Sequence, residues 1–537
     1  MVKSEYDALI ATPASNDRDP LHIELVYDAP LSQAEVQTRL SNALPEVNAR
    51  AEAAFDADGD RFYFITFPEI DPHGQEREVF SFARALRSEM QAAEANPVLP
   101  DSLYGAVHVG TEGLFGFCET PRDNSRPFGW HHARIRTPLA WAHTRGNGSK
   151  VAAIDTGYTG HNELYDVIET QGQWNFVESD GDARDRFSGG FLKNPGHGTL
   201  VASVIASRGD ADMQGNTTSP GGVTGTAPAA KVLPIRTVRS VIDFTQRRIA
   251  AAITHAVNER ADVIVMALGG PTRVASTEQA LRNAAKAGTV IVCAAGNCYP
   301  AVVFPAAYAP MGICTAVAAL QPDNRPWRKS GRGREVTFAA YGEHVWGAAK
   351  NKASDPDAGI RSSQGTTLAT SMTAGIAALW VARHGGRLAL LDKANAAGTT
   401  VQAMWVHCAT HGMTKPPEWR GANDLGAGII DAKRLLDAPL PTGTESPAPP
   451  DSDATTTLNV LVEHLAGQSS EAATEVTPAL AEYAPEILWL SYRRGARARI
   501  AESGGGTEAI LPQDLATPGL QQAVTNKPAL AALIGTG

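Results

Sequence analysis

The chain has 537 residues, of which 19% are charged and 43% hydrophobic, and its formal net charge is −10. This composition excludes a mostly disordered chain, a coiled coil and a collagen-like rod. The negative charge argues against a general nucleic-acid binder, although a local basic patch stays possible. No apolar run approaches the ~20 residues that cross a bilayer, and the first residues lack an apolar signal-peptide core. With only five cysteines, we expect a cytoplasmic protein without a disulfide framework and without a membrane partner.

Residues 1–18 are polar and are expected to be disordered, whereas residues 19–105 alternate strand-like and helix-like patterns. The pieces are a strand from Leu21 to Tyr27, a helix opened by Ser32 and Glu35, a strand from Asp58 to Phe67, a helix from Phe80 to Ala93 and an extended stretch from Asn96 to Leu103. The first strand alternates apolar and polar residues, and Ser and Glu three residues apart are typical of a capping box. The order predicts a small α+β domain of the ferredoxin-like type.

Residues 106–437 have a different pattern, in which short apolar runs alternate with amphipathic stretches. The runs extend from Lys150 to Asp155, from Lys231 to Arg236, from Ala261 to Gly270 and from Gly288 to Asn297. Such runs, separated by helices, indicate a three-layer α/β domain whose parallel sheet is covered on both faces. In open sheets of this type the ligand lies at the carboxyl ends of the strands, where Asp155 and Asn297 are expected.

The chain ends in two segments that carry no recognisable chemistry. Residues 438–457 are rich in Pro, Ser, Thr and Asp and are predicted to be a flexible linker. Residues 458–537 contain apolar-periodic pieces and are predicted to form a small helical region that could bind a protein partner.

Four positions in the α/β segment could carry chemistry: Asp155, His197, Asn297 and the hydroxyl-rich stretch 362–380. Each has an ordinary structural explanation on its own, because acids and amides are common in turns and hydroxyls often cap helices. Together, an acid, an imidazole, an amide and a hydroxyl at strand ends and helix starts match a nucleophilic hydrolase. The order acid, histidine, hydroxyl along the chain is that of subtilisin.

Several motifs in the same order make this resemblance specific. VAAIDTG contains Asp155, GHGTLVASVIA contains His197, and IVCAAGN ends at Asn297. Further along the chain, GAGIIDAKRLL is similar to the segment that usually closes a subtilisin-like catalytic domain. The stretch 130–436 therefore resembles the catalytic domain of the subtilisin-like serine peptidases, or subtilases. The resemblance implies that Asp155 orients the imidazole, that His197 is the general base and that Asn297 donates to the oxyanion. It also implies two walls of a substrate cleft, formed by Leu268, Gly269, Gly270, Ala294, Ala295 and Gly296.

The N-terminal α+β segment resembles the subtilase propeptide, which is a folding aid and an inhibitor whose end lies in the substrate cleft. Active subtilases process themselves after this domain, which in this sequence corresponds to Leu103 to Gly105. We therefore expect two partners for the catalytic domain, a protein or peptide substrate and its own N-terminal domain. No cofactor is expected. Calcium is possible, because many subtilases carry it, but the acidic loop Asp180 to Asp185 lacks the spacing of a calcium loop.

The nucleophile position departs from the family pattern. The segment AGIAAL, from Ala374 to Leu379, fixes the frame, and Thr367 then falls on the position of the nucleophilic serine. An alternative frame uses Ser371, but it shifts the helix by four residues and turns that hydroxyl toward the core. Threonine nucleophiles exist, although the extra methyl restricts χ1.

Three functions follow from this departure. The first is an endopeptidase, slow or regulated, that hydrolyses peptide bonds through Thr367. The second is a catalytically degenerate subtilase, a pseudoprotease that acts as a binding scaffold. The third is a peptidase that is controlled through its C-terminal region.

Overall fold

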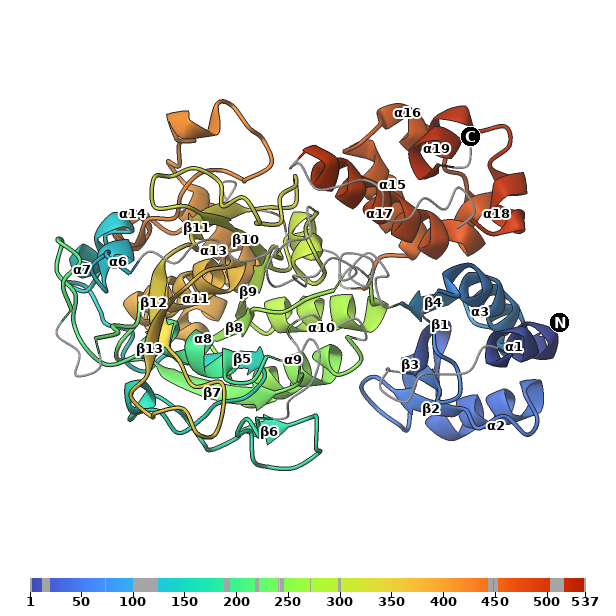
Figure 1. Ribbon diagram of the computed structural model, residues 1–537, viewed down its shortest axis with the longest axis horizontal. Helices are drawn as coiled ribbons and strands as arrows, with labels where there is room; N and C mark the ends of the chain where they lie inside the picture. The colour runs from blue at the N-terminus through green and yellow to red at the C-terminus, as the bar shows by residue number, and fades with distance from the viewer. Residues whose placement is uncertain are drawn as a thin grey trace.

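The structure is a computed structural model that describes residues 2–11, 20–72, 74–99, 124–187, 194–217, 222–239, 241, 246–270, 272–297, 301–442, 448, 453–502 and 516–535. Three parts follow one another along the chain: an N-terminal α+β domain, a central α/β domain and a C-terminal helical region. In Figure 1 the α/β domain occupies the left side, and the other two parts lie together on the right, near the end of helix α10 (Ala275–Lys286). Among the described residues, no helix is long and apolar enough to span a membrane.

The N-terminal domain has the βαββαβ order of a ferredoxin-like fold. Its elements are β1 (Leu21–Leu31), α2 (Gln33–Ala43), β2 (Arg50–Ala53), β3 (Asp60–Phe67), α3 (Glu76–Met90) and β4 (Glu94–Val98). The strands form one antiparallel sheet in the order β2-β3-β1-β4. The capping box of Ser32 and Glu35 opens α2 as expected, whereas the sequence pattern did not reveal the short β2.

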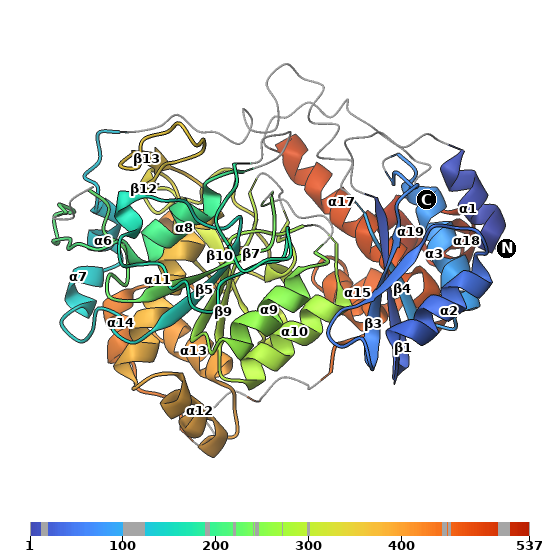
Figure 2. The ribbon, with the colours of Figure 1, turned by 90° about the horizontal axis from the view of Figure 1, so that it is seen from below.

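The two faces of this sheet have different neighbours. Helices α2 and α3 lie on the side away from the α/β domain, as Figure 2 shows. The opposite face is covered by the α/β domain, because Val26 and Phe62 pack on Ala275, and Phe64 packs on Val274. The period-2 geometry of a strand therefore sends the even-numbered residues of β1 toward the α/β domain.

The expectation of disorder over residues 1–18 is wrong for residues 2–10, which form helix α1 (Val2–Ile10) against α3. Val2, Tyr6 and Leu9 lie one helical turn apart and are buried. The ring of Tyr6 lies 6.1 Å from that of Phe82. Three apolar residues on one face suffice to bind an otherwise polar segment, and a reading of its average polarity misses them. Residues 12–19 lie outside the described residues.

The α/β domain contains the predicted parallel sheet. Its strands are β5 (Lys150–Asp155), β6 (Trp174–Asn175), β7 (Lys231–Arg236), β8 (Val263–Met266), β9 (Val290–Ala294), β10 (Thr315–Leu320) and β11 (Phe338–Tyr341). They pair in parallel in the order β11-β10-β9-β8-β5-β7-β6. Helices α8 (His197–Ala206) and α11 (Thr366–Arg383) pack together on one face, while α9 (Ile249–Asn258), α10 and α13 (Val401–Thr410) cover the other. The three-layer α/β prediction is confirmed.

Shorter elements complete this domain. They are α6 (Trp130–Arg134), α7 (Thr137–Ala140), η2 (Asn162–Leu164), η3 (Ala306–Met311), β12 (Val345–Ala348), β13 (Ile360–Ser363), α12 (Arg387–Ala396), η4 (Pro417–Trp419) and α14 (Ala432–Asp437). Strands β12 and β13 form a separate antiparallel pair.

The C-terminal region is helical and lies beside both other parts (Figures 1 and 2). Its elements are α15 (Thr457–Ala466), α16 (Ser470–Thr474), η6 (Pro478–Tyr483), α17 (Ala484–Glu502), α18 (Pro518–Ala523) and α19 (Pro528–Ile534).

The predicted flexible linker 438–457 is wrong at its C-terminal end. The backbone N–H of Ala454 donates to Gln279 at 2.9 Å, and that of Thr455 donates to Glu278 at 2.7 Å. Both acceptors are side chains of α10, so the segment docks on the α/β domain before α15 begins. The polar composition that suggested a free linker is compatible with burial here, because the backbone groups find partners.

Candidate active site

Asp155 and His197 meet at the carboxyl edge of the sheet. Asp155 is the last residue of β5 and is only 1% exposed. Its Oδ1 accepts a hydrogen bond from the backbone N–H of Thr156 at 2.7 Å. The two carboxylate oxygens lie 2.9 and 3.0 Å from Nδ1 of His197. Since a carboxylate only accepts, Nδ1 carries the proton and Nε2 is left as the acceptor in the neutral ring.

His197 begins helix α8, and the glycine before it fixes the direction of the chain. Gly196 has a φ of +78°, and a Cβ at this position would collide with the carbonyl oxygen of Lys350. The backbone N–H of Gly196 donates to Asp185 at 2.7 Å. A residue with a side chain would therefore displace the start of α8 and with it the imidazole.

Thr367 lies opposite the other ring nitrogen of His197. Its Oγ1 is 3.1 Å from Nε2, a distance at which the hydroxyl donates to the neutral imidazole. Thr367 is in the first turn of α11 and is 4% exposed. Ser371, the alternative candidate, is fully buried, and its hydroxyl donates to the carbonyl oxygen of Thr367 at 2.8 Å. Its position one helical turn deeper excludes Ser371 from the contact with His197.

Asn297 lies beside the same helix start. Its Oδ1 accepts from both the backbone N–H and the hydroxyl of Thr366, each at 2.8 Å. These two bonds orient the amide so that Nδ2 is the remaining donor, and within the described part of the chain Nδ2 has no acceptor. Gly365 has a φ of +137°, and a Cβ there would come within 2.9 Å of Nδ2, so the glycine leaves space at the amide.

The expected cleft walls follow the neighbouring strands β8 and β9, but their backbones are already paired. The N–H of Gly269 donates to the carbonyl oxygen of Val241 at 3.0 Å, and Gly270 exchanges two hydrogen bonds with Phe304. In the second wall, which begins at Ala294, the N–H and the carbonyl oxygen of Ala295 are both bonded, and the carbonyl oxygen of Gly296 accepts from Gly331 at 2.6 Å. Addition of a substrate strand at Gly269 would require Val241 to move.

Val303 occupies the space between these walls. A Cβ on Gly269 would meet the Val303 side chain at 2.6 Å, and a Cβ on Gly296 would meet it at 3.0 Å. A substrate side chain that enters between the walls would therefore contact Val303. Val303 was not predicted as a site residue, because nothing in the sequence around it indicates which strands it lies between.

A buried arginine also supports the site and was not predicted. Arg236 is 1% exposed, and its guanidinium lies 3.0 Å from Glu178 and 3.6 Å from Asp185. It also donates to the carbonyl oxygen of Thr156. Because Asp185 binds the residue before His197, Arg236 links the segment after Asp155 to the start of α8. Only its place at the end of an apolar run could have suggested this role.

The acidic loop pairs with arginines. Asp180 lies 2.5 Å from Arg186, and Asp182 lies 2.7 Å from Arg184. Hydrogen bonds from the backbone and from these arginines lower the pKa of both carboxyls. Among the described residues, no group of three or more His, Cys, Asp or Glu side chains is placed to hold a metal ion. The expected processing site, Leu103 to Gly105, lies outside the described residues.

Comparison with known proteins decides the family. The model of the subtilase family matches residues 146–428, which is more than half of the chain. The chain belongs to the subtilase family. Thermitase of Thermoactinomyces vulgaris is 32% identical over 265 residues, which are 48% of this subtilase and 85% of thermitase. The major intracellular serine protease of Bacillus subtilis is 33% identical over 227 residues, which are 41% and 66% of the two chains.

Among solved structures, fervidolysin from Fervidobacterium pennivorans, a keratinolytic enzyme, aligns with a TM-score of 0.53 at 17% identity. The alignment covers 80% of this subtilase and 63% of fervidolysin. At this identity the likeness concerns the fold alone.

Proposed function

We propose that this subtilase is an endopeptidase in which Asp155, His197 and Thr367 form the catalytic triad. The observation that carries the proposal is the position of His197, which bridges the Asp155 carboxylate through Nδ1 and the Thr367 hydroxyl through Nε2. Membership of a peptidase family supports the same reaction.

In the proposed reaction, Oγ1 of Thr367 attacks the carbonyl carbon of the scissile bond while its proton passes to Nε2 of His197. Asp155 stabilises the imidazolium that forms. Nδ2 of Asn297 donates to the oxyanion of the tetrahedral intermediate, a contribution of about 10²–10³ in turnover for one such donor. His197 then protonates the leaving amine. A water molecule, deprotonated by the same imidazole, hydrolyses the resulting ester on Thr367.

We further infer that the N-terminal domain acts as a propeptide that inhibits the active site. Its sheet packs on Val274 and Ala275 at the start of α10 in the catalytic domain, and the carboxylate of Glu24 accepts from the backbone N–H groups of Ala275 and Ser276, each at 2.7 Å. The end of the domain runs toward the cleft, since the carbonyl oxygen of Leu99 accepts from Thr272 at 3.3 Å. Thr272 is two residues beyond Gly270 in the first cleft wall.

A pseudoprotease is the second candidate, and specific observations favour it. Thr367 carries a methyl group that serine lacks, the N–H of Gly269 is already bonded to Val241, and Val303 fills the space between the cleft walls. These three features disfavour cleavage of an extended peptide in this cleft. The cytoplasmic location, the absence of a cofactor and the optional calcium stay predictions.

Intact-mass analysis of the purified full-length protein separates the two functions, with His197→Ala and Thr367→Ala as companions. We expect the parent alone to lose an N-terminal piece that ends near Tyr104. Cleavage that survives Thr367→Ala but not His197→Ala would assign the nucleophile to another hydroxyl. A parent that stays intact, and that also leaves added peptide substrates intact after its chain is cut at this point by another protease and the N-terminal fragment has been removed, would support the pseudoprotease.

A further inference from the structure

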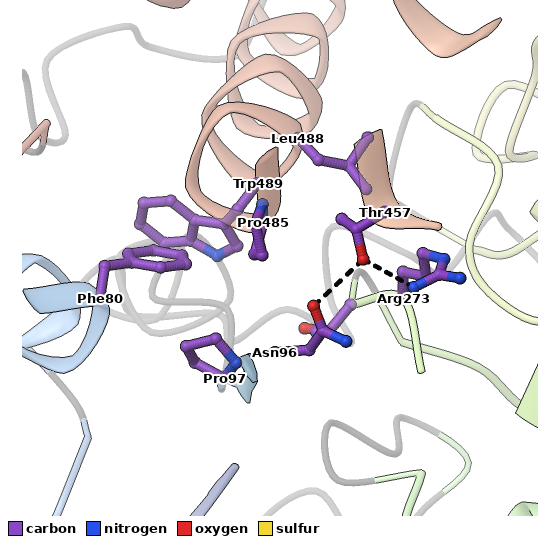
Figure 3. A pocket seen from close by; sticks show the side chains of 9 residues that line it. Phe80, Asn96, Pro97, Arg273, Thr457, Pro485, Leu488 and Trp489 are labelled. Carbon is purple, nitrogen blue, oxygen red and sulfur yellow. Dashed lines mark hydrogen bonds between the residues drawn. The ribbon is translucent and has the colours of Figure 1, made fainter. Parts of the chain in front are cut away.

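The three parts of the chain meet at one junction outside the active site. Figure 3 shows side chains from the N-terminal domain, the catalytic domain and the C-terminal helices converging there. The residues that line it are Phe80, Asn96, Pro97, Thr272, Arg273, Thr457, Pro485, Leu488 and Trp489. The remaining cavity is about 20 Å³, room for one water molecule. The junction is therefore a packed interface and not a site for a small ligand.

Arg273 is the point where all three parts touch. It is buried, and its guanidinium lies 2.9 Å from Glu278 of its own domain and 3.6 Å from Glu94 of the N-terminal domain. It also donates to the hydroxyl of Thr457 at 2.7 Å. Thr457 in turn bonds the N-terminal domain, because its backbone N–H donates to Glu94 at 2.9 Å and its hydroxyl lies 3.1 Å from Asn96 (Figure 3).

A second contact joins the C-terminal helices to the N-terminal domain directly. Arg84 of α3 lies 2.7 Å from Glu486 of α17, and the Glu486 side chain is 1% exposed. Thr517 binds both partners, since its hydroxyl accepts from Arg84 and its backbone N–H donates to Glu486. Burial raises the pKa of Glu486, while Arg84 and Thr517 act to lower it. Removal of one member of a buried ion pair leaves the other charge uncompensated, which would destabilise this interface.

Aromatic contacts along α17 add to this ion pair. The ring of Phe80 meets that of Trp489 edge to face, with centroids 5.5 Å apart. Further along α17, Tyr492 packs in the same way on Phe304 of the catalytic domain at 5.6 Å. One helix of the C-terminal region therefore holds an aromatic contact with each of the other two parts.

We propose that the C-terminal helical region is a binding surface for the N-terminal domain, and that it clamps this domain onto the catalytic domain. The N-terminal domain then stays bound after the chain is cut between the two domains. Its release requires the clamp of α15 and α17 to open. The consequence for activity rests on the proposed inhibitory role of the N-terminal domain, but the binding itself does not.

The experiment uses the full chain in a Thr367→Ala background, with a recognition sequence for an unrelated, specific protease inserted after Tyr104. After cleavage, native mass spectrometry and dilution gel filtration measure how fast the N-terminal fragment dissociates. We expect Arg84→Met and Trp489→Ala each to speed dissociation by about tenfold or more. Glu486→Gln keeps the shape of the side chain and its bond to Thr517 but loses the charge, so it is expected to have an intermediate effect.

Arg247→Met is the matched control, because Arg247 pairs at 2.5 Å with Glu52 of the N-terminal domain at an exposed position that the C-terminal helices do not share. Ion pairs at exposed positions contribute little to the free energy of binding. We therefore expect the dissociation rate to change by less than about threefold. Thermal unfolding of the uncut variants establishes that each is folded. Equal dissociation rates for the parent, Glu486→Gln and Trp489→Ala would overturn the proposal that the C-terminal region clamps the N-terminal domain.

The same experiment with Thr367 restored separates this inference from the proposed function. A cut chain that retains its N-terminal fragment and hydrolyses peptides at full rate would contradict the inhibitory role while the clamp stands. A fragment that leaves at the same rate in parent and clamp variants, with activity rising as it leaves, would contradict the clamp and support the inhibitor.

Discussion

Thr367 differs from the serine of the subtilase motif by one methyl group. The methyl restricts χ1, and the residue is almost completely buried beside His197. A serine at this position could rotate freely toward the substrate carbonyl. We expect Thr367→Ser to raise the rate of self-cleavage and of peptide hydrolysis by about tenfold, equivalent to ~1.4 kcal/mol of barrier.

Single-turnover rates of the two proteins provide the measurement, and Ser371→Ala is the control, since its hydroxyl bonds the Thr367 carbonyl and is expected to affect stability more than rate. An unchanged or lower rate in Thr367→Ser would show that this cleft has adapted to threonine.

Part of this site could be predicted from the sequence because the motifs are local. Asp155, His197 and Asn297 each end or begin a recognisable run, and the frame of the helix at Ala374 to Leu379 selected Thr367. Arg236 and Val303 escaped prediction, because their roles depend on which distant segments they touch. A single sequence carries no signal for such contacts.

At the scale of one element, helix α10 receives its cap from another domain. No side chain of its own caps it, and Glu24 of β1 accepts instead from the backbone N–H groups of Ala275 and Ser276. Glu24 is completely buried, and burial raises its pKa despite these bonds. The positive end of the helix favours the carboxylate.

We therefore expect Glu24→Gln to speed dissociation of the N-terminal fragment from the cut chain by about tenfold, since a neutral amide loses one acceptor and the charge. The same dilution measurement applies. Glu52→Gln on strand β2 of the same sheet, an exposed carboxylate in the same interface, is expected to change the rate by less than about threefold. Equal effects of the two variants would contradict a capping role for Glu24.

Elements with strong internal patterns were predictable, whereas those that depend on partners were not. The capping box of α2 and the alternation of β1 are encoded in a few neighbouring residues. Helix α1 and the docked end of the linker form because α3 and α10 offer them a surface. Local patterns cannot reveal a surface that another segment provides.

At the scale of the whole molecule, the interface between the first two domains contains a histidine that we expect to make binding sensitive to acid. His22 lies on the face of β1 that meets the catalytic domain, and its Nδ1 bonds Thr66 at 2.9 Å. Burial, with the charges of Arg247 and Arg248 before α9, lowers the pKa of His22 to about 3. A free N-terminal domain exposes this face, so its His22 is expected to titrate near the ordinary value of about 6.5.

The sign of the effect follows from proton linkage. Above about pH 7 the histidine is neutral in both states, so it adds no pH dependence to binding. As the pH falls from about 6.5 toward 3, the free domain takes up a proton that the bound domain excludes, so binding weakens. We expect the cut parent to bind its N-terminal fragment at least about tenfold more weakly at pH 5.0 than at pH 7.5, measured as the dissociation equilibrium by native mass spectrometry.

His22→Asn is the test of this assignment, because its amide can still reach Thr66 but does not titrate. We expect its binding to change much less between the two pH values. Burial also lowers the pKa of His131, His132 and His464. Acid is therefore expected to destabilise the rest of the fold as well. Thermal unfolding of the uncut chain at both pH values measures this general loss of stability, so that it can be separated from weaker binding of the fragment. Parent and His22→Asn fragments that weaken equally at pH 5.0 would show that His22 is not the source of the acid sensitivity.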